Sequence, residues 1–235
     1  MDIKKKKITL TNNLLEDIAI AMNDNSYENK WYLDIQNEVT ALVSDYSDDE
    51  QLEESIENEY GERFISIPTK ESHEAWEQME RFIQSLNDQN QATLDLLYSA
   101  IEGRGAFGRF KNAVYRSGLD EQWREFKGRE DRQEALEWLH SLELITGDDI
   151  EKGMQLYEEW LLKRKRQEKD IANMTRGTSV ICLYNDGHTD KLTPGETYEV
   201  LDERKEHLLI RIKDDRGKEC WLPKSHFELI HVRKV

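Results

Sequence analysis

The chain has 235 residues, of which 37% are hydrophobic and 35% charged, so it is long enough for packed cores and too apolar for a disordered chain. Its 49 acids against 33 bases give a net charge of −16, which repels phosphate backbones and leaves nucleic-acid binding only to a local basic patch. Two cysteines exclude a disulfide-built scaffold and favour the cytoplasm, and no run of roughly 18 apolar residues is present to span a membrane.

The first part of the chain is predicted to form a helix and a small antiparallel sheet. Thr11 is a suitable cap for a short amphipathic helix. The alternation in KWYLDIQNEVTALVSD, which turns at Asn37, predicts a hairpin, and residues 63–67 predict a third strand. Residues 45–59 contain eight acids, which favours a solvated segment, with docking of a basic partner as the alternative. They lack the glycine spacing of a calcium loop, so no metal is assigned there.

Four helices are then predicted by apolar residues at helical spacing. The first begins at Ser72 as its cap, and the others cover 91–102, 106–117 and 120–141. The apolar side chains that we expect on their packing faces include Leu97, Tyr98, Phe107, Phe110, Val114, Trp123, Phe126, Leu136 and Leu139. Three tryptophans, Trp76, Trp138 and Trp160, also lie on helical stripes and are interpreted as core residues.

The remainder is predicted to be a long helix and a set of short strands. Residues 148–172 follow the helical period and end in the polar segment KRKRQEKD. After Gly177 the segments TSVICLY, ETYEVLDE, LLIRIKD and ECWLP, separated by turn signals, predict a small barrel. We therefore predict an α+β domain over residues 1–145, a helical linker over 146–175 and an all-β barrel over 176–235.

Residues 103–108 spell GRGAFG, which matches the GxGxxG pattern of dinucleotide-binding loops. That function needs a strand before the glycines and a βαβ unit around them. A predicted helix precedes the glycines here, and no strand follows them. We therefore interpret Gly103 as a helix C-cap and Gly105 as a turn residue, and we predict no cofactor. An anion at the N-terminus of the next helix remains an alternative.

The segment RGAFGRFKNAVYR is the basic part of an acidic protein, with four bases and no acid. Arg104, Arg109, Lys111 and Arg116 are the bases, and they are suited to carboxylates or phosphates. The nearby rings of Trp123 and Phe126 add apolar contact if they are partly exposed. We expect a non-catalytic protein whose basic helix binds a protein partner. Binding of structured RNA or single-stranded nucleic acid through the same bases is the alternative.

Two other chemistries, metal binding and catalysis, have candidate side chains in the sequence. Cys182 with His188 and Cys220 with His226 repeat a C-x5-H spacing, but zinc sites favour tighter knuckles, so no metal is predicted. No catalytic grouping follows from spacing alone, because catalytic side chains come together in space. An enzyme would require a deep pocket that gathers ionisable groups from separate parts of the chain. The sequence assigns neither an oligomeric state nor the identity of the partner.

Residues 13 to about 145 resemble a bacterial uncharacterised protein family, number 0158. The stretches that carry the resemblance are WYLDIQNEVTALVSD, RFISIPTKESHEAWEQMERF, GRGAFGRFKNAVYRSGLDEQWREFK and ALEWL. The resemblance implies an α+β domain of bacterial origin without an established activity. At Gly108 the family pattern more often has a basic residue, which indicates that the third glycine of GRGAFG is incidental.

The C-terminal segment is similar to SH3-like barrels in DKLTPGETYEVL and CWLPKSHFELI. By position, the resemblance implies that Tyr184, Pro223 and Phe227 lie at the groove that peptide-binding members use. The tryptophan of such grooves is replaced near Leu208 or Leu209, which argues against proline-rich ligands. The resemblance implies a general interaction module, with a structural appendage as the alternative.

Overall fold

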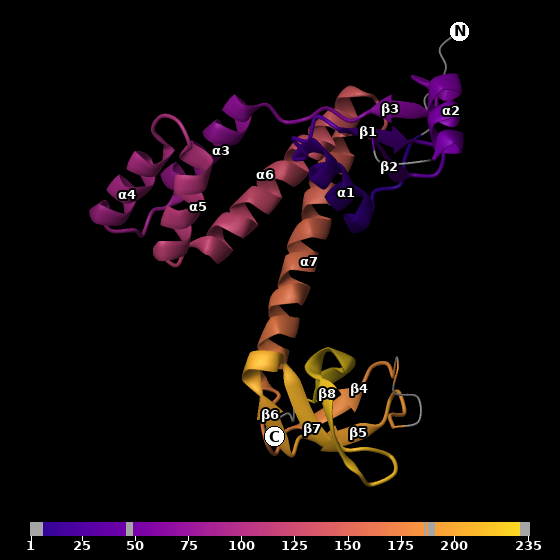
Figure 1. Ribbon diagram of the computed structural model, residues 1–235, viewed down its shortest axis with the longest axis vertical. Coiled ribbons are helices and arrows are strands. Elements are labelled where there is room, and N and C mark those ends of the chain that lie inside the picture. The colour runs from indigo at the N-terminus through magenta and orange to yellow at the C-terminus, as the bar shows by residue number, and fades with distance from the viewer. Residues whose placement is uncertain (1–6, 46–48, 186, 188–190, 231–235) are drawn as a thin grey trace. The chain divides into compact units, whose positions relative to one another are not determined.

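The computed structural model describes residues 7–45, 49–185, 187 and 191–230. The chain is α+β and divides into two compact units, Met1–Tyr157 and Glu158–Val235. The helix α7 (Gly147–Asn173) contains the boundary between them. Figure 1 shows the helices and strands of each unit with the labels used below.

The first unit begins with a helix and a three-stranded antiparallel sheet, as the sequence predicts. Thr11 caps α1, with its hydroxyl oxygen accepting a hydrogen bond from the Leu14 N–H at 3.1 Å. The sheet has the strand order β2-β1-β3, and the hairpin pairs Asp34 with Val39. The acidic segment forms a helix, α2, capped by Asp49. The bounds of these elements are α1 Asn12–Met22, β1 Asn29–Asp34, β2 Val39–Ser44, α2 Glu50–Glu59 and β3 Phe64–Ser66.

Four helices follow within the ranges that the periodicity predicts. They are α3 (Ser72–Ser85), α4 (Gln91–Ile101), α5 (Ala106–Arg116) and α6 (Asp120–Ser141). One detail of the prediction is wrong, because Ser72 is the first helical residue and Glu71 occupies the cap position. The carboxylates of Glu71 and Glu74 each accept a backbone N–H in a capping box, so a glutamate replaces the expected serine.

Two separate hydrophobic clusters stabilise the first unit, and α6 contributes to both. The sheet and α1 pack Leu15, Ile18 and Leu33 against Leu136 and Leu139 in the second half of α6. The helices α3 and α5 pack against α6, and α4 packs against α3 and α5 (Figure 1). They form the other cluster, whose members include Phe82, Leu97, Phe110, Val114, Trp123 and Phe126. A continuous helix therefore joins two cores that share no other long element.

Two of the expected packing residues lie at the surface instead. Phe107 is 49% exposed and Tyr98 is 39% exposed, whereas Phe110 and Leu97 are buried. Phe107 is in the first turn of α5, at the edge of the apolar stripe that Phe110 and Val114 define. The helical period identifies the centre of a buried stripe better than its edges.

The second unit contains the remaining strands in two three-stranded antiparallel sheets. Their orders are β5-β4-β9 and β6-β7-β8, and strand pairing among the described residues does not close them into one barrel. The core includes Val180, Ile210, Ile212 and Leu222. The strands are β4 Ser179–Cys182, β5 Thr197–Glu199, β6 Asp202–Arg204, β7 Leu209–Lys213, β8 Glu219–Pro223 and β9 Phe227–Leu229. Short 3-10 turns, η1 Lys205–His207 and η2 Lys224–His226, precede β7 and β9.

Candidate functional site: a basic groove between two helices

The GRGAFG segment forms the tight turn between α4 and α5. Gly103 has φ 68° and Gly105 has φ 77°, a left-handed conformation that glycine adopts without strain. Gly108 lies inside α5 and has no positive φ. Since a helix precedes this turn, the strand that a dinucleotide-binding unit requires is not present at this position. The pattern is explained by the turn.

Arg109 holds this turn together. Its guanidinium donates hydrogen bonds to the backbone carbonyl oxygens of Glu102 and Arg104. A Cβ added to Gly105 would lie 3.3 Å from Nη1 of Arg109, so the glycine also leaves room for this side chain. Because a guanidinium has five N–H donors, Arg109 retains donors for another group after these two bonds.

The four bases predicted as binding residues are all exposed. Arg104 lies in the turn, and Arg109, Lys111 and Arg116 lie on α5. Among the described residues, no acid forms an ion pair with any of the four, although many other bases of this chain are paired. Their positive charge is therefore available to a partner, on a chain whose net charge is −16.

A groove of about 290 Å³ runs between α4 and α5 beside these bases. Leu96, which is 44% exposed, and Ala100 line one side of it. Ala113 lines the other side, and Arg109 and Arg116 stand at its rim. Ser99 and Asn112 complete the lining. We call this feature the α4–α5 groove. It combines an apolar floor with positive charge, which suits a partner that is both apolar and anionic.

A second exposed stripe of α5 does not line the groove. Phe107, Lys111 and Tyr115 follow one another at intervals of four residues, and the two rings are 49% and 76% exposed. Sequence reasoning missed Leu96 and Tyr115 as candidate surface residues. Tyr115 follows the exposed Lys111 by four residues, so the helical period could have placed its ring at the surface.

The rings proposed to flank the basic helix pack into the protein. Trp123 lies 5.0 Å from Phe110 and 5.1 Å from Phe82 between ring centroids, both in edge-to-face geometry. Phe126 lies 5.4 Å from Phe82. Both Trp123 and Phe126 are half-buried in the second cluster. Their main contribution is to hold α6 against α3 and α5.

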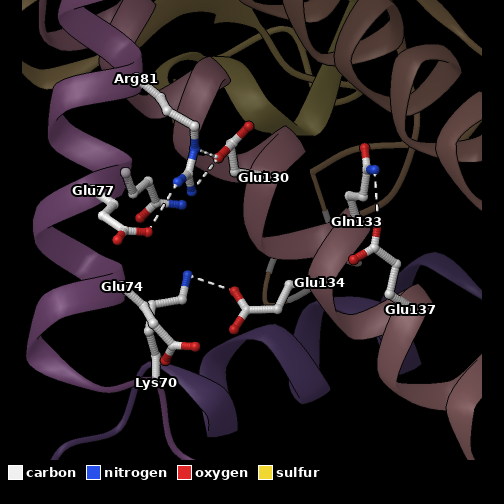
Figure 2. Close-up of a pocket in the computed structure, with 9 residues that line it drawn as sticks. Lys70, Glu74, Glu77, Arg81, Glu130, Gln133, Glu134 and Glu137 are labelled. Atoms are coloured by element: carbon white, nitrogen blue, oxygen red, sulfur yellow. Dashed lines mark hydrogen bonds and ion pairs between the residues drawn. The ribbon is translucent and has the colours of Figure 1, made fainter.

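Figure 2 shows a different feature, an open cleft of about 340 Å³ between α3 and α6. Its walls carry Lys70, Glu74, Glu77, Gln78, Arg81, Glu130, Gln133, Glu134 and Glu137. Most of these groups bind one another. Arg81 bridges Glu130 at 2.7 Å and Glu77 at 3.7 Å, and Gln133 donates to Glu137. No local sequence pattern indicates this cleft, because its residues are separated by up to 67 positions.

A buried ion network lies at the base of this cleft. Lys70 donates to Asp131 and to Glu134, each at 2.7 Å, and its side chain is 4% exposed. Gln78 also donates to Asp131, at 2.9 Å, and Lys127 pairs with the second oxygen of Asp131. Burial opposes the charge of Lys70, but the hydrogen bonds to Asp131 and Glu134 outweigh it and raise the pKa of Lys70. A lysine held in its protonated form is neither a nucleophile nor a base.

The groove residues predicted for the second unit lie in different environments. Tyr184 is 39% exposed and its hydroxyl donates to the Ser225 carbonyl at 2.7 Å, and Pro223 is half-buried. Phe227 is 3% exposed and packs edge-to-face on Tyr198, so its side chain is not available at the surface. It belongs to the core because it faces inward from β9, where it pairs with Cys182 of β4.

The two C-x5-H pairs of the sequence do not form a metal site in the residues that the structure describes. Cys182 and Cys220 are free thiols, and His188 lies outside the described residues. Within the described ranges, no group of three or more His, Cys, Asp or Glu side chains has the arrangement of a metal site. Burial raises the pKa of both thiols, which reduces their reactivity as thiolates.

Comparison with known proteins assigns the first unit. Residues 5–160 match the uncharacterised protein family UPF0158, and the chain therefore belongs to this family. The match covers the sheet, the α4–α5 groove and the cleft, and extends the resemblance found in the sequence. No curated protein matches the chain. Of the helices in the described residues, none combines the length and apolar character required to cross a membrane.

Proposed function

We propose that this protein is a non-catalytic interaction protein that binds an acidic segment of a protein partner through α5 and the α4–α5 groove. One observation carries the proposal: Arg109 and Arg116, which are exposed and form no ion pair with a described acid, line an exposed apolar groove on a chain of net charge −16. Bases that contribute to folding alone are usually paired or packed, as Lys70 and Lys127 are here. Exposed charged groups of this kind orient a partner and increase its rate of association.

The charge around the groove favours a protein over a nucleic acid. Affinity for phosphate backbones grows with the number of phosphates neutralised, and only two bases, Arg109 and Arg116, line the groove. The cleft on α3 and α6 of the same unit carries five glutamates against Lys70 and Arg81, which would repel a backbone that extends beyond α5. Phe107 and Tyr115 are exposed rings suited to base stacking, so nucleic-acid binding is retained as an outcome of the test.

An enzymatic function has less support. The α3–α6 cleft gathers ionisable groups from distant positions, but Lys70 and Arg81 are paired with the surrounding carboxylates. The raised pKa of Lys70 opposes a role in general base or nucleophilic catalysis. The network is better explained as part of the packing of α3 on α6.

We propose that the second unit is an SH3-like module and that the protein is bacterial and cytoplasmic. The two three-stranded antiparallel sheets around one core are consistent with such a module, and the free thiols are consistent with a reducing compartment. Phe227 is buried and Leu208 is 57% exposed, an arrangement unlike an aromatic groove for proline-rich peptides. The main contact is therefore assigned to the first unit.

The proposal is tested by affinity capture from a lysate of the source organism with the full-length chain as bait. The double variant Lys111→Glu, Arg116→Glu reverses two exposed charges on α5, and it is expected to lose most of the captured protein. Arg176→Glu has the same kind of charge change at an exposed position of the second unit, so it serves as the matched control. Capture that is unchanged in the double variant, or captured material that nuclease removes, contradicts the proposal.

A further inference from the structure

A second basic helical segment lies in the second half of α7. Residues 163–169, KRKRQEK, contain five bases and one acid. That acid is already used, because Glu168 pairs with Arg164 at 3.3 Å. Three other bases of the segment are exposed and form no ion pair with an acid in the part of the chain that the structure describes; they are Lys163, Arg166 and Lys169.

These three bases lie on one side of α7, and we call them the α7 basic stripe. They follow one another at intervals of three residues, which on an α-helix turns each one by only about 60° from the last. Like charges at this spacing are neighbours on the helix surface and weaken the helix that carries them. An anionic group that lies against the stripe would relieve this repulsion.

The opposite charge pattern is present on α2, which contains five glutamates and no base. Glu59 pairs with Arg63, and Ile56 is the buried residue through which the helix packs. The other four glutamates are exposed and lie at i, i+3, i+4 and i+7, so they share one face; they are Glu50, Glu53, Glu54 and Glu57. Among the described residues, no base forms an ion pair with any of the four. We call them the α2 acidic face.

We infer that the protein self-associates through these two helices, with the α7 basic stripe of one copy on the α2 acidic face of a second copy. Charge complementarity identifies the occupant, because every copy carries a helical face of the matching sign for each of the two. The stripe and the acidic face belong to different units of the chain. Two copies related by a twofold axis form the contact twice. The inference goes beyond the proposed function, since it uses neither α5 nor the α4–α5 groove.

The net charge of −16 on each copy opposes association, and salt separates the two effects. The screening length is about 10 Å at about 0.1 M salt, so distant charges repel weakly there, whereas ion pairs in contact keep most of their attraction. At about 1 M salt the length falls to about 3 Å, and the ion pairs are screened as well. We therefore expect dimers at the lower salt concentration and monomers at the higher one.

The test measures the weight-average mass of the full-length protein by sedimentation equilibrium, at several protein concentrations and at both salt concentrations. The monomer has a mass of 27.8 kDa, and the wild-type value at the lower salt is expected to exceed it. Because a single exposed ion pair contributes little, two charges are reversed together. The α7 variant is Arg166→Glu with Lys169→Glu, and the α2 variant is Glu54→Lys with Glu57→Lys. Each variant alone brings like charges together and is expected to associate at least about tenfold more weakly.

A mixture of the two variants separates a contact between copies from every other effect of the substitutions. In the mixture the acidic α7 of one variant meets the basic α2 of the other, and the unchanged stripe meets the unchanged acidic face. Both contacts are attractive again, so the mixture is expected to associate like the wild type, which also verifies that both variants are folded. The matched control is Lys111→Glu with Arg116→Glu, which reverses two exposed bases on α5 and is expected to associate like the wild type.

Four results overturn the inference. The wild type keeps the monomer mass at both salt concentrations, or the mixture is no heavier than its components, or the α5 control loses association as the α7 variant does. The fourth is a single-stranded oligonucleotide that binds the wild type but not the α7 variant while the protein stays monomeric, which assigns the stripe to nucleic acid. Lysate capture that depends on α5 tests the proposed function separately, so either can fail while the other holds.

Discussion

Among individual residues of the first unit, Lys70 and Asp131 form a buried ion pair. Their side chains are 4% and 11% exposed. The network extends to Gln78 on α3 and, through Lys127, to Asn23 at the end of α1. Replacing buried ion pairs by apolar residues is often neutral or favourable for stability. The role of this network is therefore better explained as fixing the positions of the helices than as adding stability. It defines how α3 and the end of α1 meet α6.

Asp131→Asn is predicted to destabilise the first unit by about 3 kcal/mol, because the change takes a carboxylate partner from the buried ammonium group of Lys70 and from the partly exposed one of Lys127. Burial opposes ionisation of Asp131, but the charge of Lys127 and the hydrogen bonds from Gln78, Lys127 and Lys70 outweigh it and lower its pKa below the usual 3.8. A lowered pKa in the folded state contributes stability above pH 3.8 that is lost as the pH falls through the folded value. Urea denaturation at about pH 7 and about pH 3 should therefore show the difference from wild type shrinking at the lower pH.

Glu130→Gln is the control for this prediction. Glu130 is the neighbour of Asp131 on α6, but its side chain is 31% exposed and pairs with Arg81, which is itself 49% exposed. Its loss is expected to cost no more than about 1 kcal/mol. Equal effects of the two substitutions, or an Asp131→Asn effect that is the same at both pH values, would contradict the role assigned to the network.

For helices and strands, periodicity and capping residues predicted the elements well, because each depends on neighbours a few positions away. The helix after Thr11, the hairpin with its turn near Asn37 and the three helices after residue 90 are confirmed. The cap of α3 was mispredicted because serine is a common N-cap and glutamate an uncommon one, so Ser72 was chosen instead of its neighbour Glu71. Local signals therefore specified the type and approximate ends of most elements in the first unit.

The candidate site was only partly predictable. The bases of α5 were visible as a run without acids, and their exposure agrees with that pattern. The α4–α5 groove depends on Leu96, which is adjacent in sequence to the buried Leu97 and is identified as exposed only when α4 packs beside α5. The contact of Lys70 with Asp131 joins positions 61 residues apart. Features created by tertiary packing leave no local pattern to detect.

Substitution of alanine at two helical glycines is predicted to change the free energy of unfolding in opposite directions. Gly108 has no atom within 4 Å of an added Cβ, so Gly108→Ala should stabilise α5 by about 0.5–1 kcal/mol through helix propensity. In α7, a Cβ at Gly153 would lie 2.6 Å from Cδ2 of Leu136. Gly153→Ala should therefore destabilise by about 1–3 kcal/mol despite the same gain in propensity. Thermal unfolding measures both changes, and a lower melting temperature for Gly108→Ala would contradict the interpretation of that glycine as incidental.

Across the whole molecule, charge is distributed unevenly along the chain and hydrophobic packing is local. Residues 48–103 carry 15 acids and 3 bases, whereas residues 104–116 carry four bases and no acid. The chain is therefore strongly anionic as a whole, while one helix carries a local excess of positive charge. The hydrophobic clusters are also local: two lie in the first unit, and the third includes only residues from Met174 onward. The segment 104–116 contributes to both charge and packing, because its four bases are exposed while Phe110 and Val114 pack in the second cluster.

Because the clusters share no residue, the two units are expected to unfold in separate calorimetric transitions. Leu136 and Ile210 are each fully buried, one in each unit, and truncation to alanine should cost about 2–5 kcal/mol in either case. Leu136→Ala should lower only the transition of Met1–Tyr157, and Ile210→Ala only that of Glu158–Val235. The shift should be larger for Ile210→Ala, since small domains move by about 4–8 °C for each kcal/mol and domains above 150 residues by about 2–4 °C. A single transition that both variants lower would mean that the units unfold as one cooperative body.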